Sequence, residues 1–199
     1  MKICLISPYE SVAAYGLRIL SSVLKRDGHA VEMIFLPLDF HDSIPPKALE
    51  QTVERAVSSS LVGVSLSSNY MRLSIDITRA VKERNPNVPV LWGGIHPTIE
   101  PIECLDFCDI ACVGEAEDAF SELARKMDAG KPYADTLNFY FKLPDGSIVS
   151  NPVRALDPDI DKIPFPDYSG EGHFILNDGC IVPVTHELLD KNLMGQYLT

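Results

Sequence analysis

Three cysteines recur at intervals of four residues in the segment CLDFCDIAC, at Cys104, Cys108 and Cys112. Evenly spaced thiols suggest an iron–sulfur cluster, because cysteine thiolates are the usual ligands of such clusters. A cluster also needs thiolates that converge on one loop, where backbone amide groups can reach the sulfur atoms. Whether these three converge depends on the elements that carry them.

Two periodicities alternate along residues 1–130. Short apolar runs rich in β-branched residues predict five strands, at 2–7, 30–35, 61–67, 88–94 and 109–114. Each run is followed by helical spacing, at 17–24, 45–58, 70–84, 99–107 and 116–129. Strands that alternate with helices imply right-handed crossovers and a parallel sheet covered on both faces. The predicted fold class is therefore α/β, a doubly wound (Rossmann-like or flavodoxin-like) five-stranded parallel sheet.

In this arrangement Cys104 and Cys108 lie near the end of a short helix, whereas Cys112 lies in the fifth strand between Ala111 and Val113. A strand cysteine among apolar neighbours is typical of a small core residue. We favour that interpretation over a metal ligand.

The character of the chain changes after Gly130. Residues 130–199 contain seven of the fifteen prolines. A hairpin is predicted with its turn at 144–146, followed by an extended connector over 151–170, because proline fixes φ and disfavours helix before it. The remaining residues are too few for a second core.

Composition limits the classes of partner. The chain of 199 residues has a formal net charge of −11 and five cysteines. This acidic balance offers no basic surface for nucleic acid or anionic lipid. No apolar run approaches the roughly 20 residues of a membrane helix, and residues 1–10 do not form a secretory signal. An odd number of unpaired cysteines favours the reducing cytoplasm.

The expected strands end in unusual segments. Ligands of open parallel sheets bind beyond the carboxyl ends of the strands, where the strand order reverses. Here those ends lead into small, glycine-containing or hydroxyl-bearing stretches at 7–16, 65–70, 93–98 and 114–117. Neither the G-x-G-x-x-G fingerprint nor the G-x-x-x-x-G-K-[ST] phosphate loop occurs. Taken singly these residues are typical of turns, but together on one edge they favour a binding site.

Four motifs follow one another in a specific order. Ser65-x-Ser67 precedes GGIHPTIEP at 93–101, VGEAEDAF follows at 113–120, and DIDKIPFPDY stands at 159–168. In this order they resemble the N-terminal cobalamin-binding domain of cobalamin-dependent radical S-adenosylmethionine enzymes. The serines and Gly93-Gly94 resemble segments that line the nucleotide tail of the cofactor. The last motif resembles the connector to the catalytic barrel.

The resemblance implies that residues 1–130 bind cobalamin and that 131–199 form a hairpin and linker. The linker would lead to a radical S-adenosylmethionine barrel absent from this chain. That barrel would be the partner of the domain and would hold the [4Fe–4S] cluster and S-adenosylmethionine. The implied cofactor-binding residues are Ser11, Ala13, Gly16, Ser65, Ser67, Gly93, Gly94, His96, Gly114 and Glu115.

Two departures from related patterns matter. Other cobalamin domains carry Asp-x-His-x-x-Gly after the first strand, where the histidine ligates cobalt. Counted back from Gly16, those positions hold Ser11 and Ala13, so the resemblance implies base-off cobalamin without an axial histidine. The Cys-x3-Cys-x2-Cys motif of the barrel is also missing. We therefore interpret the chain as a domain of a longer enzyme and predict no catalytic residue and no activity for these residues alone.

Several side chains have alternative roles. His96 could replace the axial ligand, although a histidine before proline more often shapes its turn. Glu115 and Glu117 could cap the following helix instead of contacting the cofactor. Tyr9, Tyr15 and Tyr70 are rim residues of undecided role. Trp92 is predicted to be core, and surface positions are predicted for His29, His41, His173 and His186.

Two other classes of function compete with a cobalamin module. A flavodoxin-like or receiver-like domain would bind flavin, a phosphoryl group or a protein. A receiver needs acidic residues where this chain has Ser7-Pro8 and residues 65–69, which counts against it. A degenerate cobalamin-type domain without cofactor, which positions substrate or partner, fits the missing histidine equally well.

Overall fold

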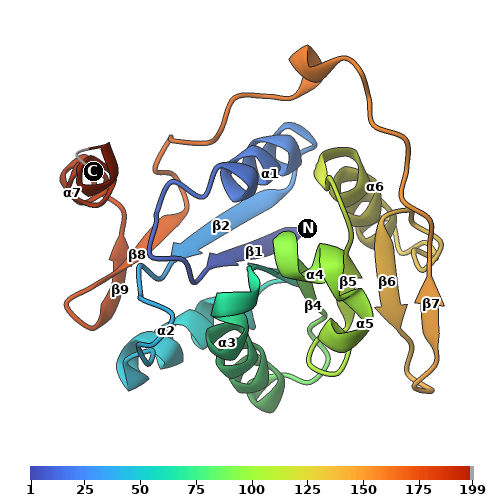
Figure 1. The fold of residues 1–199 in the computed structure, drawn as a ribbon, viewed down its shortest axis with the longest axis horizontal. Helices are drawn as coiled ribbons and strands as arrows, with labels where there is room; N and C mark the ends of the chain where they lie inside the picture. Colours follow the sequence, from blue (N-terminus) through green and yellow to red (C-terminus); the bar gives the residue numbers. More distant parts are fainter. Residues whose placement is uncertain (198–199) are drawn as a thin grey trace.

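The computed structural model describes residues 1–197, with side chains as far as Leu193. Within this range a nine-stranded sheet has the order β7-β6-β5-β4-β3-β1-β2-β8-β9 (Figure 1). The strands are β1 Lys2–Ser7, β2 Ala30–Phe35, β3 Leu61–Ser65, β4 Val90–Gly93, β5 Ile110–Cys112, β6 Phe139–Lys142, β7 Ile148–Ser150, β8 His173–Asn177 and β9 Cys180–Pro183. The helices are α1 Tyr15–Arg26, α2 Pro46–Ala56, α3 Met71–Arg84, α4 Ile95–Ile99, α5 Pro101–Cys104, α6 Glu117–Asp128 and α7 His186–Tyr197.

The doubly wound parallel core is confirmed. Strands β5, β4, β3, β1 and β2 pair in parallel, and their order reverses between β1 and β3. The prediction of five strands was too low, because residues after 130 add two hairpins to the sheet edges. The β6–β7 hairpin pairs antiparallel to β5, and β8 pairs parallel to β2. Thus the parallel part of the sheet has six strands.

Helices cover both faces of the sheet (Figure 1). Helices α1 and α6 pack on one face around Leu5, Leu24 and Phe120. Helices α2 and α3 pack on the other face around Ile6, Val64 and Ile77. The opposite orientation of neighbouring strand residues explains why each strand serves two cores.

The helix predicted over 99–107 is divided in the structure. Helix α4 begins earlier, at Ile95, and α5 begins at Pro101 after Glu100, whose backbone (φ −126°, ψ 59°) is not helical. Proline cannot donate the next helical hydrogen bond and forces the preceding residue out of the helical region. The chain therefore restarts as a second short helix at Pro101.

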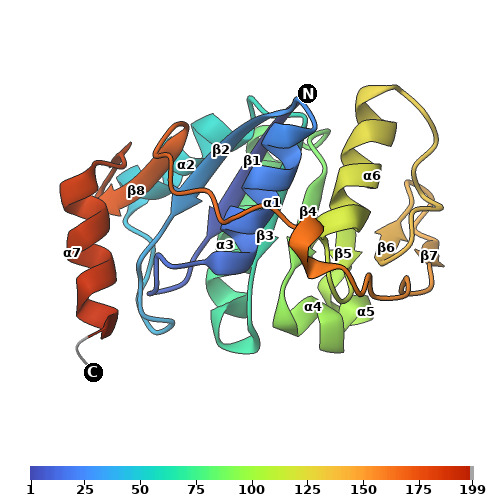
Figure 2. The same ribbon diagram turned by 90° about the horizontal axis from the view of Figure 1, so that it is seen from above.

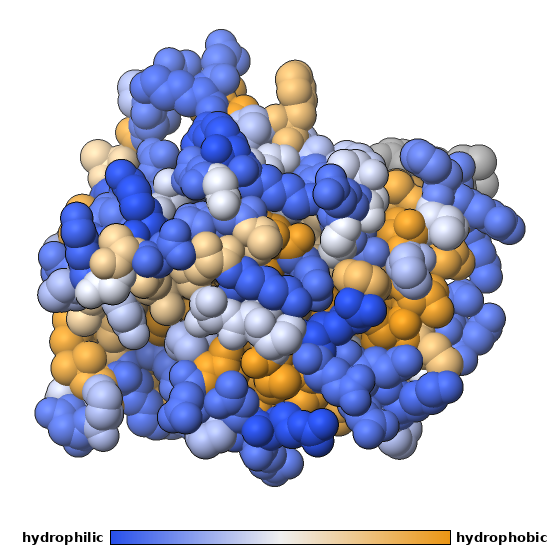
Figure 3. Space-filling model, turned by 180° about the vertical axis from the view of Figure 1, so that it is seen from behind, coloured by the Kyte–Doolittle hydropathy of each residue, from blue (hydrophilic) through white to orange (hydrophobic). Residues whose placement is uncertain are grey.

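A long connector joins the two edges of the sheet. After β7 the chain crosses the outer side of α1 and reaches β8 beside β2 (Figure 2). The β8–β9 hairpin turns at Asp178 (φ 48°) and Gly179 (φ 77°), and two positive φ angles fit the twist of a tight hairpin. The face of the molecule seen from behind mixes polar residues with separate apolar areas (Figure 3).

Two of the four histidines predicted at the surface are buried, so this prediction was wrong for them. His173 is 2% exposed and His29 is 8% exposed. His173 meets Asp167, and the His29 ring meets the amino group of Met1. Met1 is 28 positions from His29, and Asp167 lies in the irregular connector before His173. The periodicity of the local sequence therefore could not reveal that these two rings are buried. His41 and His186 are exposed as predicted.

Among the described helices, none has the combination of length and apolar character that crossing a membrane requires.

The connector allows a test of how β8 docks. A Cβ atom on Gly172, at φ 72°, would lie 2.7 Å from the carbonyl oxygen of Val31 in β2. Gly179 has nearly the same φ, but a Cβ atom there would have no neighbour within 4 Å. We expect Gly179→Ala to cost about 1 kcal/mol through backbone strain and Gly172→Ala to cost about 1–3 kcal/mol more. Urea unfolding of both variants checks this difference, and equal losses would contradict it.

Candidate functional site

A cavity of about 420 Å³ opens at the carboxyl ends of the parallel strands. It lies between the sheet and helices α1 and α6, and its wall includes β1 and β3, where the strand order reverses. Small-molecule sites typically occupy about 300–1,000 Å³. Both the volume and the position are those of a ligand site in an open parallel sheet.

The sheet lines the cavity in two layers. Leu5, Gly63 and Leu91 are register partners on neighbouring strands and form the inner layer. Ser65 and Gly93 are also register partners and stand two residues further along their strands. Residues two apart share a face and are separated by about 6.6 Å. The outer layer therefore lies nearer the mouth by that distance.

The residues of the two helices follow the same order from the mouth of the cavity to its interior. Helix α1 runs back from the strand ends, so Gly16 lies near the mouth and Leu20 lies deeper. Helix α6 likewise places Glu117 near the mouth and Phe120 deeper. The inner part of the cavity is thus enclosed by apolar side chains. The polar side chains gather at the mouth, namely Tyr9, Ser65, Glu115 and Glu117.

Glycines keep the cavity open. Gly16 has no atom within 4 Å of its missing Cβ, and a Cβ on Gly93 would meet only Cys112 and Leu91 at ordinary distances of 3.8 and 3.9 Å. A Cβ on Gly63 would lie 2.9 Å from Leu5 Cδ2. Gly94 differs, because its φ is 103° and its Cβ would lie 2.7 Å from the Leu66 carbonyl oxygen. Gly94 is therefore required by backbone packing, and Gly16 and Gly93 by cavity space.

Six of the ten residues predicted from the resemblance line the cavity: Gly16, Ser65, Gly93, Gly94, Gly114 and Glu115. The other four lie outside the lining: Ser11, Ala13, Ser67 and His96. Ser11 Oγ accepts a hydrogen bond from the backbone of Ala13 at 3.2 Å. This contact shapes the loop before α1, next to the cavity residue Ala14.

His96 is held away from the cavity. Its Nδ1 lies 3.0 Å from Ser68 Oγ, and its Nε2 lies 3.9 Å from Glu103 Oε2. Its backbone nitrogen donates to the Leu66 carbonyl at 3.3 Å. The residue thus joins α4 to the segment after β3, which matches a role in shaping the turn.

Tyr9 organises the mouth of the cavity. Its ring packs edge-on against Tyr70, with ring centroids 4.8 Å apart. Burial raises the pKa of Tyr9, although hydrogen bonds with the side chains of Ser65 and Ser67 oppose that shift. The phenol therefore stays protonated at neutral pH and can donate or accept a hydrogen bond. Ser67, outside the lining itself, supports the site through this hydroxyl.

The remaining mouth residues come from the loop before α6. Asn138 donates from its side chain to the carbonyls of Val113 and Glu115, at 2.9 and 3.1 Å. These bonds fix the turn at Gly114, whose φ is 76°. Glu117 lies in the first turn of α6, where a carboxylate suits the helix dipole, and it also lines the cavity. The structure is compatible with both roles proposed for these acids.

Sequence reasoning missed several lining residues. Leu5, Leu91 and Phe120 have the pattern of ordinary core positions, which they also are. Gly63 offered a signal, because an isolated glycine inside an apolar strand often marks a close approach of another group. Ala14 has an unusual left-handed conformation (φ 38°, ψ 46°) before α1, which costs about 1–2 kcal/mol for a residue with a Cβ. No local sequence signal indicates that strain.

Cys104, Cys108 and Cys112 are buried core residues, as was predicted for Cys112. Cys104 and Cys108 belong to the core under α3, and Cys112 belongs to the core under α1 and α6. The sheet thus separates Cys112 from the other two. Burial raises the pKa of Cys104 and of Cys112 to about 12. Among the described residues, no three His, Cys, Asp or Glu side chains are grouped as a metal site would require. Trp92 is also core, and its Nε1 donates to Thr78 Oγ1 at 2.8 Å.

The fold and the cavity define a doubly wound cofactor-binding domain with its site at the strand-order reversal. Residues 1–124 match the B12 binding domain family. The chain belongs to that family. Its glycine-lined cavity fits the group that the family implies, because absent side chains leave a slot beside the sheet.

Comparisons with individual proteins agree with this assignment. The chain is 26% identical over 159 residues to the uncharacterized methyltransferase PH0819 of Pyrococcus horikoshii, covering 77% of this chain and 33% of that protein. The radical S-adenosylmethionine methyltransferase TsrM from Kitasatospora setae, solved with cobalamin and a [4Fe–4S] cluster, has a TM-score of 0.64 at 19% identity, over 83% of this chain and 31% of that chain.

The cobalamin-dependent S-adenosylmethionine radical enzyme OxsB, solved with aqua-cobalamin and S-adenosylmethionine, has a TM-score of 0.67 at 15% identity. That match covers 85% of this chain and 25% of OxsB. The two structural likenesses show the fold. The chain spans a quarter to a third of the length of these proteins.

The burial of the thiols predicts their reactivity. Cys180 is partly exposed, whereas the four other cysteines are buried. At pH 8 iodoacetamide should modify Cys180 quickly and the others at least about 100-fold more slowly, because the thiolate fraction falls tenfold with each unit of pKa. Mass spectrometry of a labelling time course checks this expectation. Cys180→Ser should remove the fast phase, and a second fast thiol in that variant would contradict the assignment.

Proposed function

We propose that this domain binds cobalamin in the base-off form, with the nucleotide tail in the cavity and no histidine on cobalt. The observation that carries the proposal is the gradation of the cavity, from hydroxyl and carboxylate groups at the mouth to an apolar interior. This gradation lies in the strand-order reversal of a chain that belongs to the B12 binding domain family.

The tail of cobalamin has the same gradation. Its ribose and phosphate are polar, and its terminal dimethylbenzimidazole is largely apolar. The base would enter the apolar inner part of the cavity, which Leu5, Gly63 and Phe120 line. Burial of the apolar base there is favourable, whereas an unpartnered polar group would be costly.

The outer layer would hold the polar parts of the ligand. Ser65 and Tyr9 carry hydroxyl groups within the lining, and both can donate to sugar or phosphate oxygens. Glu115 and Glu117 can accept hydrogen bonds from the amide groups around the corrin ring. Gly93 lets the ligand approach the strand end closely, because its missing side chain leaves space in the cavity.

The described lining contains no histidine. His96 is engaged with Ser68, and the position expected for an axial histidine is Ala13, a nearly buried methyl group. When bound, cobalamin supplies a cobalt centre that can carry a methyl group or exchange an electron. The role of this domain is then to hold the corrin, exclude the base from cobalt and offer no side-chain nitrogen in its place.

We further propose that the domain serves a radical S-adenosylmethionine enzyme, a methyltransferase or an enzyme of related radical chemistry. The names of PH0819, TsrM and OxsB support that class. The [4Fe–4S] cluster and S-adenosylmethionine would then be held by a partner barrel downstream, and activity would require that barrel.

A paired titration tests the site in the cavity. We expect hydroxocobalamin to bind and to change its absorbance spectrum, and Gly93→Val to weaken binding about 5- to 150-fold by filling tail space. Cobinamide, which is a corrin without the nucleotide, is the matched control ligand and should bind both proteins within about threefold. Equal losses for both ligands would show that Gly93 does not act through the tail. No binding of hydroxocobalamin by the unaltered domain would overturn the proposed function.

Paramagnetic resonance tests the axial ligand. An axial nitrogen on Co(II) splits the cobalt lines into triplets, so we expect no triplets in the domain loaded with Co(II) cobalamin. The His96→Ala variant should give the same spectrum, because the His96 ring is bonded to Ser68 outside the cavity. Triplets that disappear in His96→Ala would identify His96 as the ligand and contradict the histidine-free site.

A further inference from the structure

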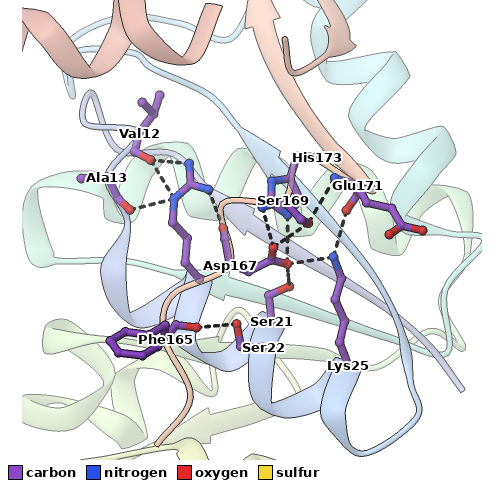
Figure 4. A network of polar contacts seen from close by, with 11 residues as sticks. Val12, Ala13, Ser21, Ser22, Lys25, Phe165, Asp167, Ser169, Glu171 and His173 are labelled. Atoms are coloured by element: carbon purple, nitrogen blue, oxygen red, sulfur yellow. Dashed lines mark hydrogen bonds and ion pairs between the residues drawn. The ribbon is translucent and has the colours of Figure 1, made fainter. Parts of the chain in front are cut away.

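Helix α1 separates the cavity from the connector. One side of α1 lines the cavity through Gly16, Leu17 and Leu20. The connector crosses the other side, where polar side chains of α1 bind it (Figure 4). These side chains follow helical spacing: Arg18, Ser21, Ser22 and Lys25.

Arg18 is the member of this set that also reaches the cofactor loop, which is the segment at 12–14 before α1. Its side chain is completely buried. Nε donates to the Ala13 carbonyl at 2.9 Å, Nη2 donates to the Val12 carbonyl at 2.9 Å, and Nη1 donates to the Asp167 carbonyl at 2.8 Å. One guanidinium thus joins the loop before α1 to the connector.

The surroundings of Arg18 are unusual for a buried cation. The guanidinium carbon lies 4.5 Å from the centre of the Phe35 ring and 4.3 Å from that of Tyr168. Among the described residues no carboxylate forms an ion pair with it, and burial lowers its pKa. Planar stacking and a fork of donors are properties of arginine that lysine cannot reproduce. The geometry therefore demands arginine and not merely a positive charge.

Asp167 secures the connector side of this contact. Its carboxylate accepts hydrogen bonds from Ser21 at 2.7 Å and His173 at 3.1 Å, and it pairs with Lys25 at 2.8 Å. Burial alone would raise the pKa of Asp167, but these bonds together with one from Ser169 hold it well below its usual range. Since the carboxylate is at the centre and the histidine at one end, this cluster is not a nucleophilic triad.

The loop that Arg18 holds borders the cavity. The backbone carbonyls of Val12 and Ala13 precede Ala14, which lines the cavity in a left-handed conformation. A strained residue keeps its conformation only where its surroundings determine it. Arg18 fixes the two preceding carbonyls, and its own backbone nitrogen donates to the Ala14 carbonyl at 3.0 Å.

We propose that Arg18 is a positioning residue that ties the connector to the cofactor loop at 12–14. A displacement of the connector at Asp167 and Tyr168, which Arg18 contacts, is transmitted to that loop through the guanidinium, so this part of the connector belongs to the cobalamin site. This inference rests on the proposed function, because the loop comes just before Gly16 at the mouth of the cavity, where the corrin ring would lie.

The test compares Arg18→Lys with Ser22→Ala. Ser22 also holds the connector, donating to the Phe165 carbonyl at 2.7 Å, but it does not touch the loop. Titrations with hydroxocobalamin and with cobinamide, a urea unfolding curve, and hydrogen exchange of the amides at 12–14 are measured for each variant. Arg18→Lys should bind both corrinoids about tenfold or more weakly, because the loss concerns bonds to a charged group. Its loop amides should exchange faster, while Ser22→Ala should match the unaltered domain within about threefold in both titrations.

The outcomes separate the two proposals. A domain that binds hydroxocobalamin, with Arg18→Lys binding it equally well, overturns the positioning role and leaves the proposed function standing. No cobalamin binding by the unaltered domain overturns the proposed function instead. A loss with cobalamin but not with cobinamide would place Arg18 at the tail and also overturn this inference.

If Arg18→Lys does not fold, Asp167→Asn replaces it. This variant removes the carboxylate charge that holds the connector and leaves the Arg18 side chain in place. Weaker binding of both corrinoids and faster exchange at 12–14 would support transmission through the connector. Unchanged binding and exchange would overturn it.

Discussion

The cavity depends on side chains that are missing at neighbouring strand positions. Helices α1 and α6 would close onto a parallel sheet if its inward positions were Val, Ile or Leu throughout, because helices pack against such strands without gaps. At Gly93 the strand presents no side chain, and Gly16 adds none from α1, whereas Leu5 and Phe120 occupy the space beside Gly63. Deeper in the same layer, Leu24 and Phe120 are buried in the core between the helices and the sheet. Close packing in the core and missing side chains nearer the mouth therefore leave one slot between the helices and the sheet.

The same helix carries a second constraint, on its outer side. A surface helix normally faces water there, but α1 faces the connector and buries Arg18 and Ser21. Polar groups that are buried must be bonded, and this rule explains the dense contacts around Asp167. The connector is thus fixed by hydrogen bonds and ion pairs, while the sheet side of α1 is fixed by apolar packing. Substitutions that remove hydrogen bonds or charges therefore weaken the connector side of α1, whereas substitutions that change apolar volume weaken its sheet side.

Local sequence predicted the elements that local physics determines. Five β-branched runs predicted five of the six parallel strands, and Pro144-Asp145-Gly146 predicted the β6–β7 hairpin, since both signals act over a few residues. The turn at Asp178-Gly179 carried a comparable signal that was overlooked, and the pairing of β8 with β2 carried none. Motifs indicated Ser65 and Gly93, which line the mouth of the cavity. They could not reveal the inner layer, because cavity and core residues have the same composition.

The pairing of Met33 with His173 has a consequence for how the chain is made. These partners are 140 positions apart, so β2 has no neighbour on its outer edge until β8 has left the ribosome. At synthesis rates of about 5–20 residues per second, that wait lasts roughly 10–30 s. During this time the apolar strand AVEMIF presents unpaired backbone groups to other chains. The domain is thus most exposed to misassembly while it is being made, and the arrival of β8 ends that period by giving the edge its neighbour.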